Sequence, residues 1–149
     1  MTEIPVEEYL CSRIRQTEQV LMAHHEAALR GYGLTMTQYT VLLALSREDG
    51  LSAAQLARSL GVTQQSMAGV LNTLDTKGLI GRTPSPSHAK VQLTSLTAAG
   101  HALLDQAYQE VIALERALMA AFTPDEYREL SALLERAARV LVEQTPGRR

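Results

Sequence analysis

Small and amide side chains gather on one face of a predicted helix in the middle of this 149-residue chain. At about 100° per residue, Gln65, Gly69 and Asn72 point the same way, and Gln64 and Ser66 flank them. Gln and Asn amides can bond bidentately to adenine in the major groove, and glycine lets a backbone approach the duplex closely. The alternative is a merely solvated polar surface. Base reading is therefore predicted only if neighbouring elements position this helix.

Two short helices joined by a tight turn provide that position. The first is predicted to begin after Ser52, which forms a capping-box spacing with Gln55, and to end at Gly61. Thr63 is the predicted N-cap of the second helix. Apolar residues recur at helical spacing on its inner face: Met67, Val70, Leu71 and Leu74. This arrangement is typical of a helix-turn-helix.

A β-hairpin is predicted directly after the second helix. Residues 79–83 read as a strand, residues 84–90 as a proline-bearing loop, and residues 91–96 as an alternating second strand. Arg82 and Lys90 bracket the loop, where they could meet phosphate or the minor groove; the alternative is a pair of solvated hairpin charges. The predicted partner is double-stranded DNA, and the predicted contacts are Thr63, Gln64, Gln65, Ser66, Gly69, Asn72, Arg82 and Lys90.

Amphipathic helices are predicted on both sides of this centre. One spans residues 6–30, a second runs from Thr97 to Phe122, and a third begins at Thr123 and Pro124 with Glu126 at the capping-box position. These helices carry more apolar surface than a small head can cover, so we expect a homodimer on a pseudo-palindromic operator. An intramolecular bundle is the alternative. The predicted fold class is mainly α with a small β-wing, a winged helix-turn-helix flanked by N- and C-terminal dimerisation helices.

Composition fits one domain over residues 1–149, with the winged helix-turn-helix at 35–96 between dimerisation helices at 1–34 and 97–149. Hydrophobic residues make up 46% of the chain, while the net charge is −2 and the pI about 6.1. Residues 35–100 nonetheless carry five basic and three acidic side chains. The acidic pI motivates an alternative, a dimeric ligand-binding module that does not bind DNA. Disorder is predicted only for the tail at 147–149.

The sequence gives little support for metal binding or catalysis. His24 and His25 are adjacent, so on a helix they point about 100° apart and cannot chelate one ion together. His101 has Asp105 four residues on, which is a weak zinc pair. No phosphate loop or nucleophile motif occurs, so we predict no enzyme, no cofactor and no metal. Without a membrane-spanning stretch or a leader, no membrane partner and a cytoplasmic location are expected.

Three segments in order carry a resemblance to a known family. GLTMTQYTVLLAL begins at Gly33, KGLIGR at Lys77 and VQLTSLTAAG at Val91. With the helix-turn-helix and the helical flanks, the chain resembles the MarR family of bacterial transcription regulators over nearly its whole length. The resemblance implies a homodimeric repressor that a small-molecule effector releases from DNA.

Two positions depart from the family pattern. The family's wing usually carries an Asp-Arg-Arg type segment, whereas this chain has Ser87, His88 and Ala89 before Lys90. A basic residue is also usual before the last core leucine of the recognition helix, and here Thr73 stands there. Both changes remove positive charge, so DNA affinity or its salt dependence is expected to be lower than is usual in the family.

The resemblance also implies an effector cleft between the dimer helices and the reading head. The lining residues remain open, with Arg13, His24, Met36 and Tyr39 as candidates. Cys11 falls where the family's organic-hydroperoxide sensors carry their reactive thiol, so a peroxide-sensing regulator is an alternative. His25 and Met36 stand where those sensors have tyrosines, which favours a buried, inert cysteine instead.

Overall fold

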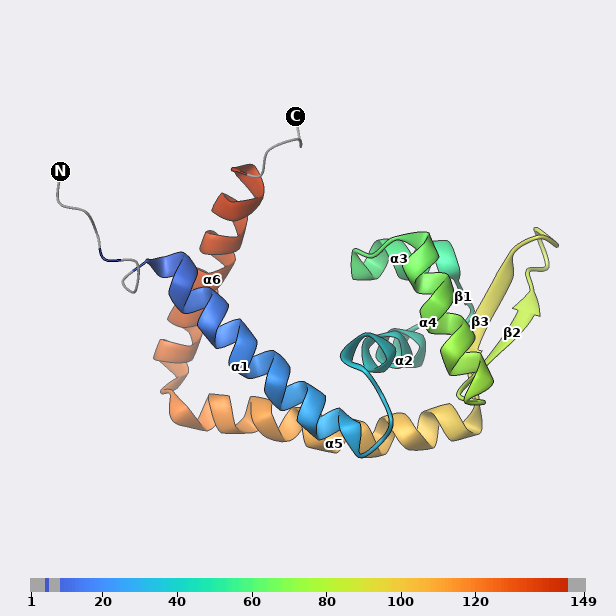
Figure 1. Cartoon of the computed structure of the whole chain (residues 1–149), viewed down its shortest axis with the longest axis horizontal. Helices are drawn as coiled ribbons and strands as arrows, with labels where there is room; N and C mark the ends of the chain where they lie inside the picture. Colours follow the sequence, from blue (N-terminus) through green and yellow to red (C-terminus); the bar gives the residue numbers. More distant parts are fainter. Residues whose placement is uncertain (1–4, 6–8, 145–149) are drawn as a thin grey trace. The chain divides into compact units, whose positions relative to one another are not determined.

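The computed structural model describes Pro5 and residues 9–144, and it contains two compact units, one ending at Val111 and one beginning at Ile112. The predicted fold class is confirmed, since the described part is mainly helical with one small antiparallel sheet (Figure 1). The elements in chain order are α1 (Leu10–Arg30), α2 (Met36–Arg47), β1 (Leu51–Ser52), α3 (Ala53–Leu60), α4 (Gln64–Thr76), β2 (Ile80–Pro84), β3 (Gln92–Leu96), α5 (Ala98–Ala121) and α6 (Pro124–Glu143).

The helix-turn-helix forms as its capping residues predict. In α3 the Ser52 hydroxyl accepts from the Gln55 backbone N–H, and the Gln55 side chain accepts from the Ser52 N–H. Gly61 follows with φ at +66°, the left-handed conformation that a turn between two helices requires. Thr63 then caps α4 through the Ser66 N–H. Short-range hydrogen bonds therefore define both ends of the turn that leads into α4.

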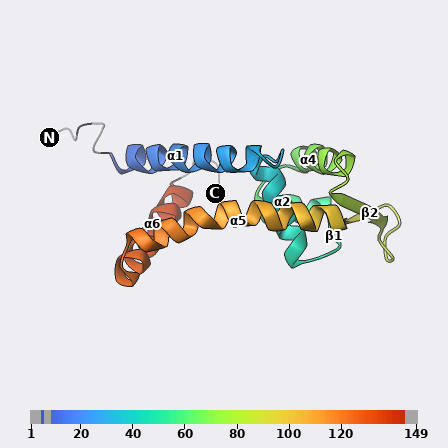
Figure 2. The same cartoon turned by 90° about the horizontal axis from the view of Figure 1, so that it is seen from below.

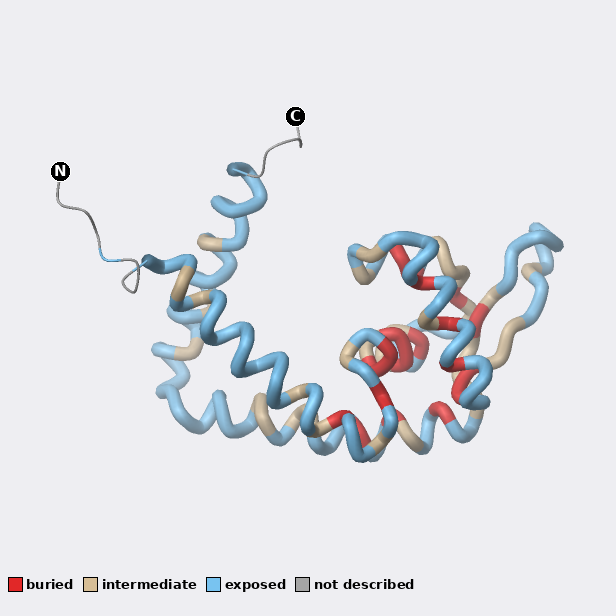
Figure 3. The backbone as a smooth tube through the Cα atoms, in the orientation of Figure 1, coloured by how far each residue is buried: buried red, intermediate tan, exposed pale blue. Residues whose placement is uncertain are grey.

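The hydrophobic core of the first unit lies among α2, α3, α4, the sheet and the first half of α5 (Figure 3). From α4 it takes Met67, Leu71 and Leu74, all at most 2% exposed, while Val70 is half-buried. Deep burial of one face leaves the opposite face of α4 to solvent, as the helical spacing predicts. α2 contributes Val41, Leu42 and Leu45, α3 contributes Leu56 and Ala57, and α5 contributes Leu104 and Ala107.

The sheet has three strands rather than the expected two. Its order is β1-β3-β2, because Leu51 and Ser52 pair with Thr94 and Leu93. A two-residue strand is too short to leave a periodic signal, and its partner lies some forty residues away, so sequence reasoning missed it. The hairpin itself lies alongside α4 (Figures 1 and 2).

Three of the four predicted strand ends shift by one residue, and the end at Leu96 is as predicted. β2 extends to Pro84, which pairs with Gln92, although we expected this proline in the loop. β2 is an edge strand, and a terminal edge position tolerates the missing N–H of proline. Val91 lies in the loop, where its N–H donates to the His88 carbonyl and its own carbonyl accepts from the Ser85 N–H.

The helices α1 and α6 differ at their starts. α1 starts at Leu10, later than the expected residue 6, with Tyr9 as an N-cap that makes no side-chain cap bond; positions 6–8 and the 147–149 tail lie outside the described residues. In the second unit, α6 has the predicted capping box between Thr123 and Glu126 with Pro124 in its first turn. Within the described residues, no helix is both long and apolar enough to cross a membrane.

Candidate nucleic-acid interface

The outer face of α4 presents the predicted base-reading residues to solvent. Gln64, Gln65, Gly69 and Asn72 are all exposed, and nothing lies within 4 Å of a Cβ built on Gly69. Thr63 and Ser66 are exposed as well, but the Thr63 hydroxyl both accepts from the Ser66 N–H and donates to the Ser66 hydroxyl. These two side chains therefore hold the helix start, and the amides of Gln64 and Gln65 are the protruding polar groups.

Asn72 and Arg82, predicted as separate DNA contacts, meet each other in the structure. The Arg82 Nη2 on β2 donates to the Asn72 Oδ1 on α4 over 2.9 Å. The Arg82 Nε also lies 3.7 Å from the Asp75 carboxylate, one helical turn further along α4, and is buried without a hydrogen-bond partner. Sequence reasoning did not pick out Asp75. The contact joins the hairpin to α4.

Lys90 differs from Arg82 in its surroundings. It lies on the exposed loop between β2 and β3, with Ser87 and His88 on the same loop also exposed. An exposed ammonium on a projecting loop can reach phosphate oxygens without breaking an internal contact. The exposure of Lys90 is compatible with the predicted contact to the DNA backbone.

Lys77 ties the end of α4 to the segment between α1 and α2. Its Nζ donates to the Gly33 carbonyl over 2.5 Å and to the Gln38 Oε1 over 3.2 Å. Gln38 is the partner of Thr35 in the capping box that starts α2. Lys77 therefore links the start of α2 to the C-terminal end of α4. The sequence showed Lys77 only as part of the KGLIGR motif, so this contact was not foreseen.

Two glycines allow close packing here: Gly78 in the turn after α4 and Gly100 near the start of α5. Gly78 has φ at +70°, and it and Leu79 donate N–H bonds to the last carbonyls of α4, those of Asp75 and Leu74. The Thr97 hydroxyl donates to the Gly78 carbonyl and accepts from the Gly100 N–H. A Cβ on Gly100 would lie 2.0 Å from the Leu79 carbonyl oxygen. The start of α5 can pack this closely only because residue 100 is glycine.

An open hollow of about 360 Å³ lies where α1 meets α2. Of the four effector candidates, only Met36 lines it; the other lining residues are Met22, Glu26, Arg30, Leu34, Thr35 and Thr37. The hollow thus combines three apolar side chains with one arginine and one glutamate. The signal that could have found the hollow is the glycine-rich break between the two helices.

The other three effector candidates do not line this hollow. Tyr39 is 2% exposed in the core, where burial raises the pKa of its hydroxyl and nearby Tyr108 raises it further. Arg13 and His24 are exposed on α1. The neighbouring His25 is half-buried, and burial, followed by the charge of His24, lowers the pKa of its imidazole.

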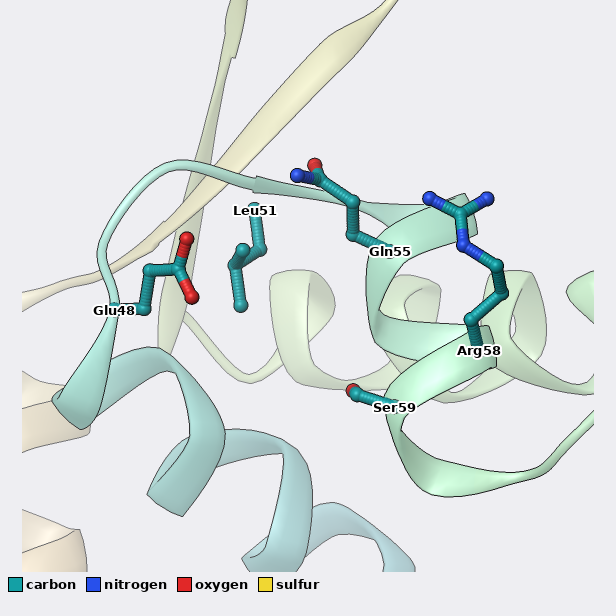
Figure 4. A pocket seen from close by; sticks show the side chains of 5 residues that line it. All are labelled: Glu48, Leu51, Gln55, Arg58 and Ser59. Carbon is teal, nitrogen blue, oxygen red and sulfur yellow. The ribbon is translucent and has the colours of Figure 1, made fainter.

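A second hollow, of about 370 Å³, lies beside α3 (Figure 4). Gln55, Arg58 and Ser59 line it from α3, and Glu48 and Leu51 line it from the segment after α2. The Gln55 amide oxygen is already engaged with Ser52 in the α3 cap. Facing acidic and basic side chains give this hollow no single charge preference.

Cys11 lies in the first turn of α1 as an exposed free thiol. The expectation of a buried cysteine is wrong for the single chain. Among the residues that the structure describes, no three His, Cys, Asp or Glu side chains lie close enough to hold a metal ion.

Known proteins resemble this chain in both sequence and structure. The MarR family model matches residues 32–90. The HTH-type transcriptional repressor Rv2887 of Mycobacterium tuberculosis is 38% identical over 117 residues, which cover 78% of this chain and 84% of that protein. The homoprotocatechuate degradative operon repressor of Escherichia coli is 24% identical over 120 residues, covering 80% and 81%.

One similar solved structure contains DNA. The transcriptional repressor CouR, bound to a 23-mer DNA duplex, matches with a TM-score of 0.81 and 26% identity over 92% of this chain and 99% of CouR. The match includes the winged helix-turn-helix and its flanking helices. The expectation that the chain is not an enzyme agrees with this kinship. The chain belongs to the MarR family of transcriptional regulators.

Proposed function

We propose that this regulator is a homodimeric repressor that reads a pseudo-palindromic operator with α4 and leaves it when a small molecule binds. It would act in the cytoplasm, on chromosomal DNA. The proposal rests on the outer face of α4, where Gln64, Gln65 and Gly69 are exposed and nothing lies within 4 Å of a Cβ built on Gly69. Similarity to a repressor bound to a DNA duplex supports the same use of this face.

The proposed contacts divide by chemistry. Gln64, Gln65 and Asn72 carry amides that can meet base edges, and Gly69 allows close approach of the helix backbone. Thr63 and Ser66 cap α4, whose first N–H groups and positive dipole end favour a phosphate. Lys90 contacts the DNA phosphate backbone from the loop between β2 and β3. Arg82 lies on β2 of the same hairpin and is therefore part of the proposed interface.

A homodimer is supported by apolar side chains that lie exposed on the flanking helices. They include Val20 and Leu21 on α1, Leu118 and Met119 on α5, and Leu130, Leu133 and Leu134 on α6. Large apolar side chains left exposed on helices are typical of association surfaces. A two-fold dimer would present two copies of α4 to successive major grooves.

The hollow at the α1–α2 junction is the proposed effector site. Leu34, Thr35 and Met36 form its wall, and Lys77 bonds to the same segment at Gly33 and Gln38. An apolar or phenolic compound seated there would bias the position of α4 through this contact if it binds the two arrangements unequally. Arg30 is the cation that would meet an acidic group on the compound.

The deciding experiment is operator binding by a Gln65→Ala variant. We expect this truncation to cost about 1–3 kcal/mol of specific binding and to relax preference at one base pair in each half-site. The parent's operator is selected from randomised duplexes, and affinities are measured by fluorescence anisotropy. Gln106→Ala, an exposed truncation on α5, is the matched control. Unchanged affinity and selectivity in Gln65→Ala would refute base reading by this residue.

The exposure of Cys11 favours testing oxidation sensing as a second candidate. If peroxide acts at this thiol, the parent should leave DNA under hydroperoxide while Cys11→Ser stays bound, because serine cannot form a sulfenic acid. If effector binding alone controls release, neither protein responds to oxidant. We expect the second outcome, because His25 and Met36 occupy the positions of the tyrosines that surround the thiol in the sensors.

A further inference from the structure

Arg82 is held against the reading helix rather than extended from the wing. Its Nη2 donates to the Asn72 Oδ1 at 2.9 Å, and its Nε lies 3.7 Å from the Asp75 carboxylate. The side chain is 28% exposed, although it lies on a hairpin whose loop is largely exposed. Lys90, the other wing cation, is exposed without such an anchor in the hydrogen bonds and ion pairs of the described chain.

We propose that Arg82 is a positioning residue that fixes the orientation of the Asn72 amide and thereby determines which base edges Asn72 can read. A guanidinium has five N–H donors and no acceptor, so the atom of Asn72 that faces it must be the oxygen. The Asn72 NH₂ group is then turned away from the wing. This inference rests on the proposed function, because it assumes that the outer face of α4 meets DNA.

The orientation changes the expected reading chemistry. A bidentate bond to adenine needs both the amide oxygen and the amide nitrogen directed at the base. With its oxygen occupied by Arg82, Asn72 offers two N–H donors to the groove. The base edge that it meets should therefore carry an acceptor there, such as guanine O6 or N7 or thymine O4.

Asp75 strengthens the arrangement by charge. Its carboxylate lies one turn after Asn72 on α4, so the guanidinium is drawn to the helix by one ion pair and one hydrogen bond. A carboxylate beside the guanidinium also offsets part of the positive charge that Arg82 would otherwise bring to a phosphate. Lys90 is thus the better candidate for the sequence-independent contact.

The contact itself is tested first, without DNA. The measurement is the Asn72 side-chain NH₂ resonance in nitrogen–proton correlation spectra of the full chain, assigned by its loss in Asn72→Ala. We expect the resonance to move in Arg82→Ala and to stay in place in Lys90→Ala. An unmoved resonance in Arg82→Ala would overturn the inference and leave the proposed function intact. Thermal unfolding of each variant verifies that it folds.

The reading role is tested on the operator that the parent selects from randomised duplexes. We expect Arg82→Ala and Asn72→Ala to lose preference at the same base pair, each by about tenfold, and the double variant to lose no more than either one. The slope of log affinity against log salt should barely change in Arg82→Ala. In Lys90→Ala it should fall by about one per lost phosphate contact, with base preference kept.

Other outcomes decide against the inference. A salt slope that falls in Arg82→Ala while base preference is kept would make Arg82 a phosphate contact. A double variant whose loss is the product of the two single losses would make the residues independent.

Asn72→Asp should keep the Arg82 contact and lose the base preference, because a carboxylate has no donor to offer. A parent that selects no sequence overturns the proposed function and this inference together.

Discussion

The two compact units differ in how far each buries its own apolar side chains. The first unit encloses a core in which Leu42, Leu56 and Leu74 are fully buried. In the second unit α6 buries none of its residues, and Leu130, Leu133 and Leu134 are 39%, 42% and 52% exposed. Both units use the same local devices, since α3 and α6 each begin with a complete capping box.

The difference separates helix formation from helix packing. Caps and spacing are enough to start α3 and α6 alike, but a face is buried only where other elements cover it. The reading head has such elements within one chain, since α2, α4 and the sheet surround α3. We infer that the apolar face of α6 is covered by a second copy.

The largest effect is expected from substitutions on the apolar face of α6. Leu130→Glu combined with Leu134→Glu should convert the proposed dimer into monomers, because two carboxylates from each chain would be buried in its interface. Operator affinity should then fall by at least about 100-fold, since two linked heads bind more tightly than one. Sedimentation equilibrium and fluorescence anisotropy measure the two effects.

The control for this change lies on the same helix. Ala132→Glu introduces a carboxylate on the far side of α6, about 200° from Leu130. It should leave both assembly and affinity unchanged. A stable dimer in the Leu130 and Leu134 variant would show that the exposed leucines have another use.

A second prediction concerns the close packing of Gly100 in the first unit. Gly100→Ala should lower the free energy of unfolding by about 1–3 kcal/mol, because the new methyl would lie 2.0 Å from a backbone oxygen that cannot rotate away. Urea unfolding followed by circular dichroism, at fixed protein concentration, measures the change. Gly69→Ala is the control, since its methyl meets open space on a helix and should stabilise by up to about 1 kcal/mol. Equal stability of Gly100→Ala and the parent would refute the steric account.

The capping boxes of α3 and α6 allow the two units to be compared by substitutions with a smaller expected effect. Ser52→Ala and Thr123→Ala should each cost about 1 kcal/mol of helix stability, because each leaves helix N–H groups without their acceptor. In α3 the loss should appear in the free energy of global unfolding. In α6 it should appear as faster hydrogen exchange confined to that helix. Ser46→Ala, which removes an exposed hydroxyl within α2, is the control and should stay within about 0.5 kcal/mol.

The smallest expected effect is a pH dependence in the second unit. The Thr123 N–H and hydroxyl both donate to the Glu126 carboxylate and lower its pKa. The ionised cap therefore contributes stability above the unfolded pKa of about 4.3, and this is lost as pH falls through the lowered folded value. The Thr123 amide shift should follow this titration in the parent. Glu126→Gln keeps the cap geometry, so the acid-dependent change should disappear; its persistence would point to another carboxylate.

Much of the fold was predictable because its signals are local. Ser52 with Gln55, Thr63 with Ser66 and Thr123 with Glu126 are each three residues apart, and the buried face of α4 repeats every three or four residues. Hydrogen bonds over such separations form within one turn of chain and depend little on the rest of the fold. The sequence by itself therefore determined the helices, the tight turn at Gly61 and the exposed face that carries Gln65.

Only the tertiary structure decided how distant residues are joined. The β1–β3 pairing, the Arg82–Asn72 bond and the Lys77–Gly33 bond link residues 10 to 44 positions apart, and each depends on how separate elements pack. Spacing could mark Asn72 and Arg82 as polar and outward, but it could not show that one orients the other. A contact of this kind exists only after α4 and the hairpin have been brought side by side by the shared core beneath them.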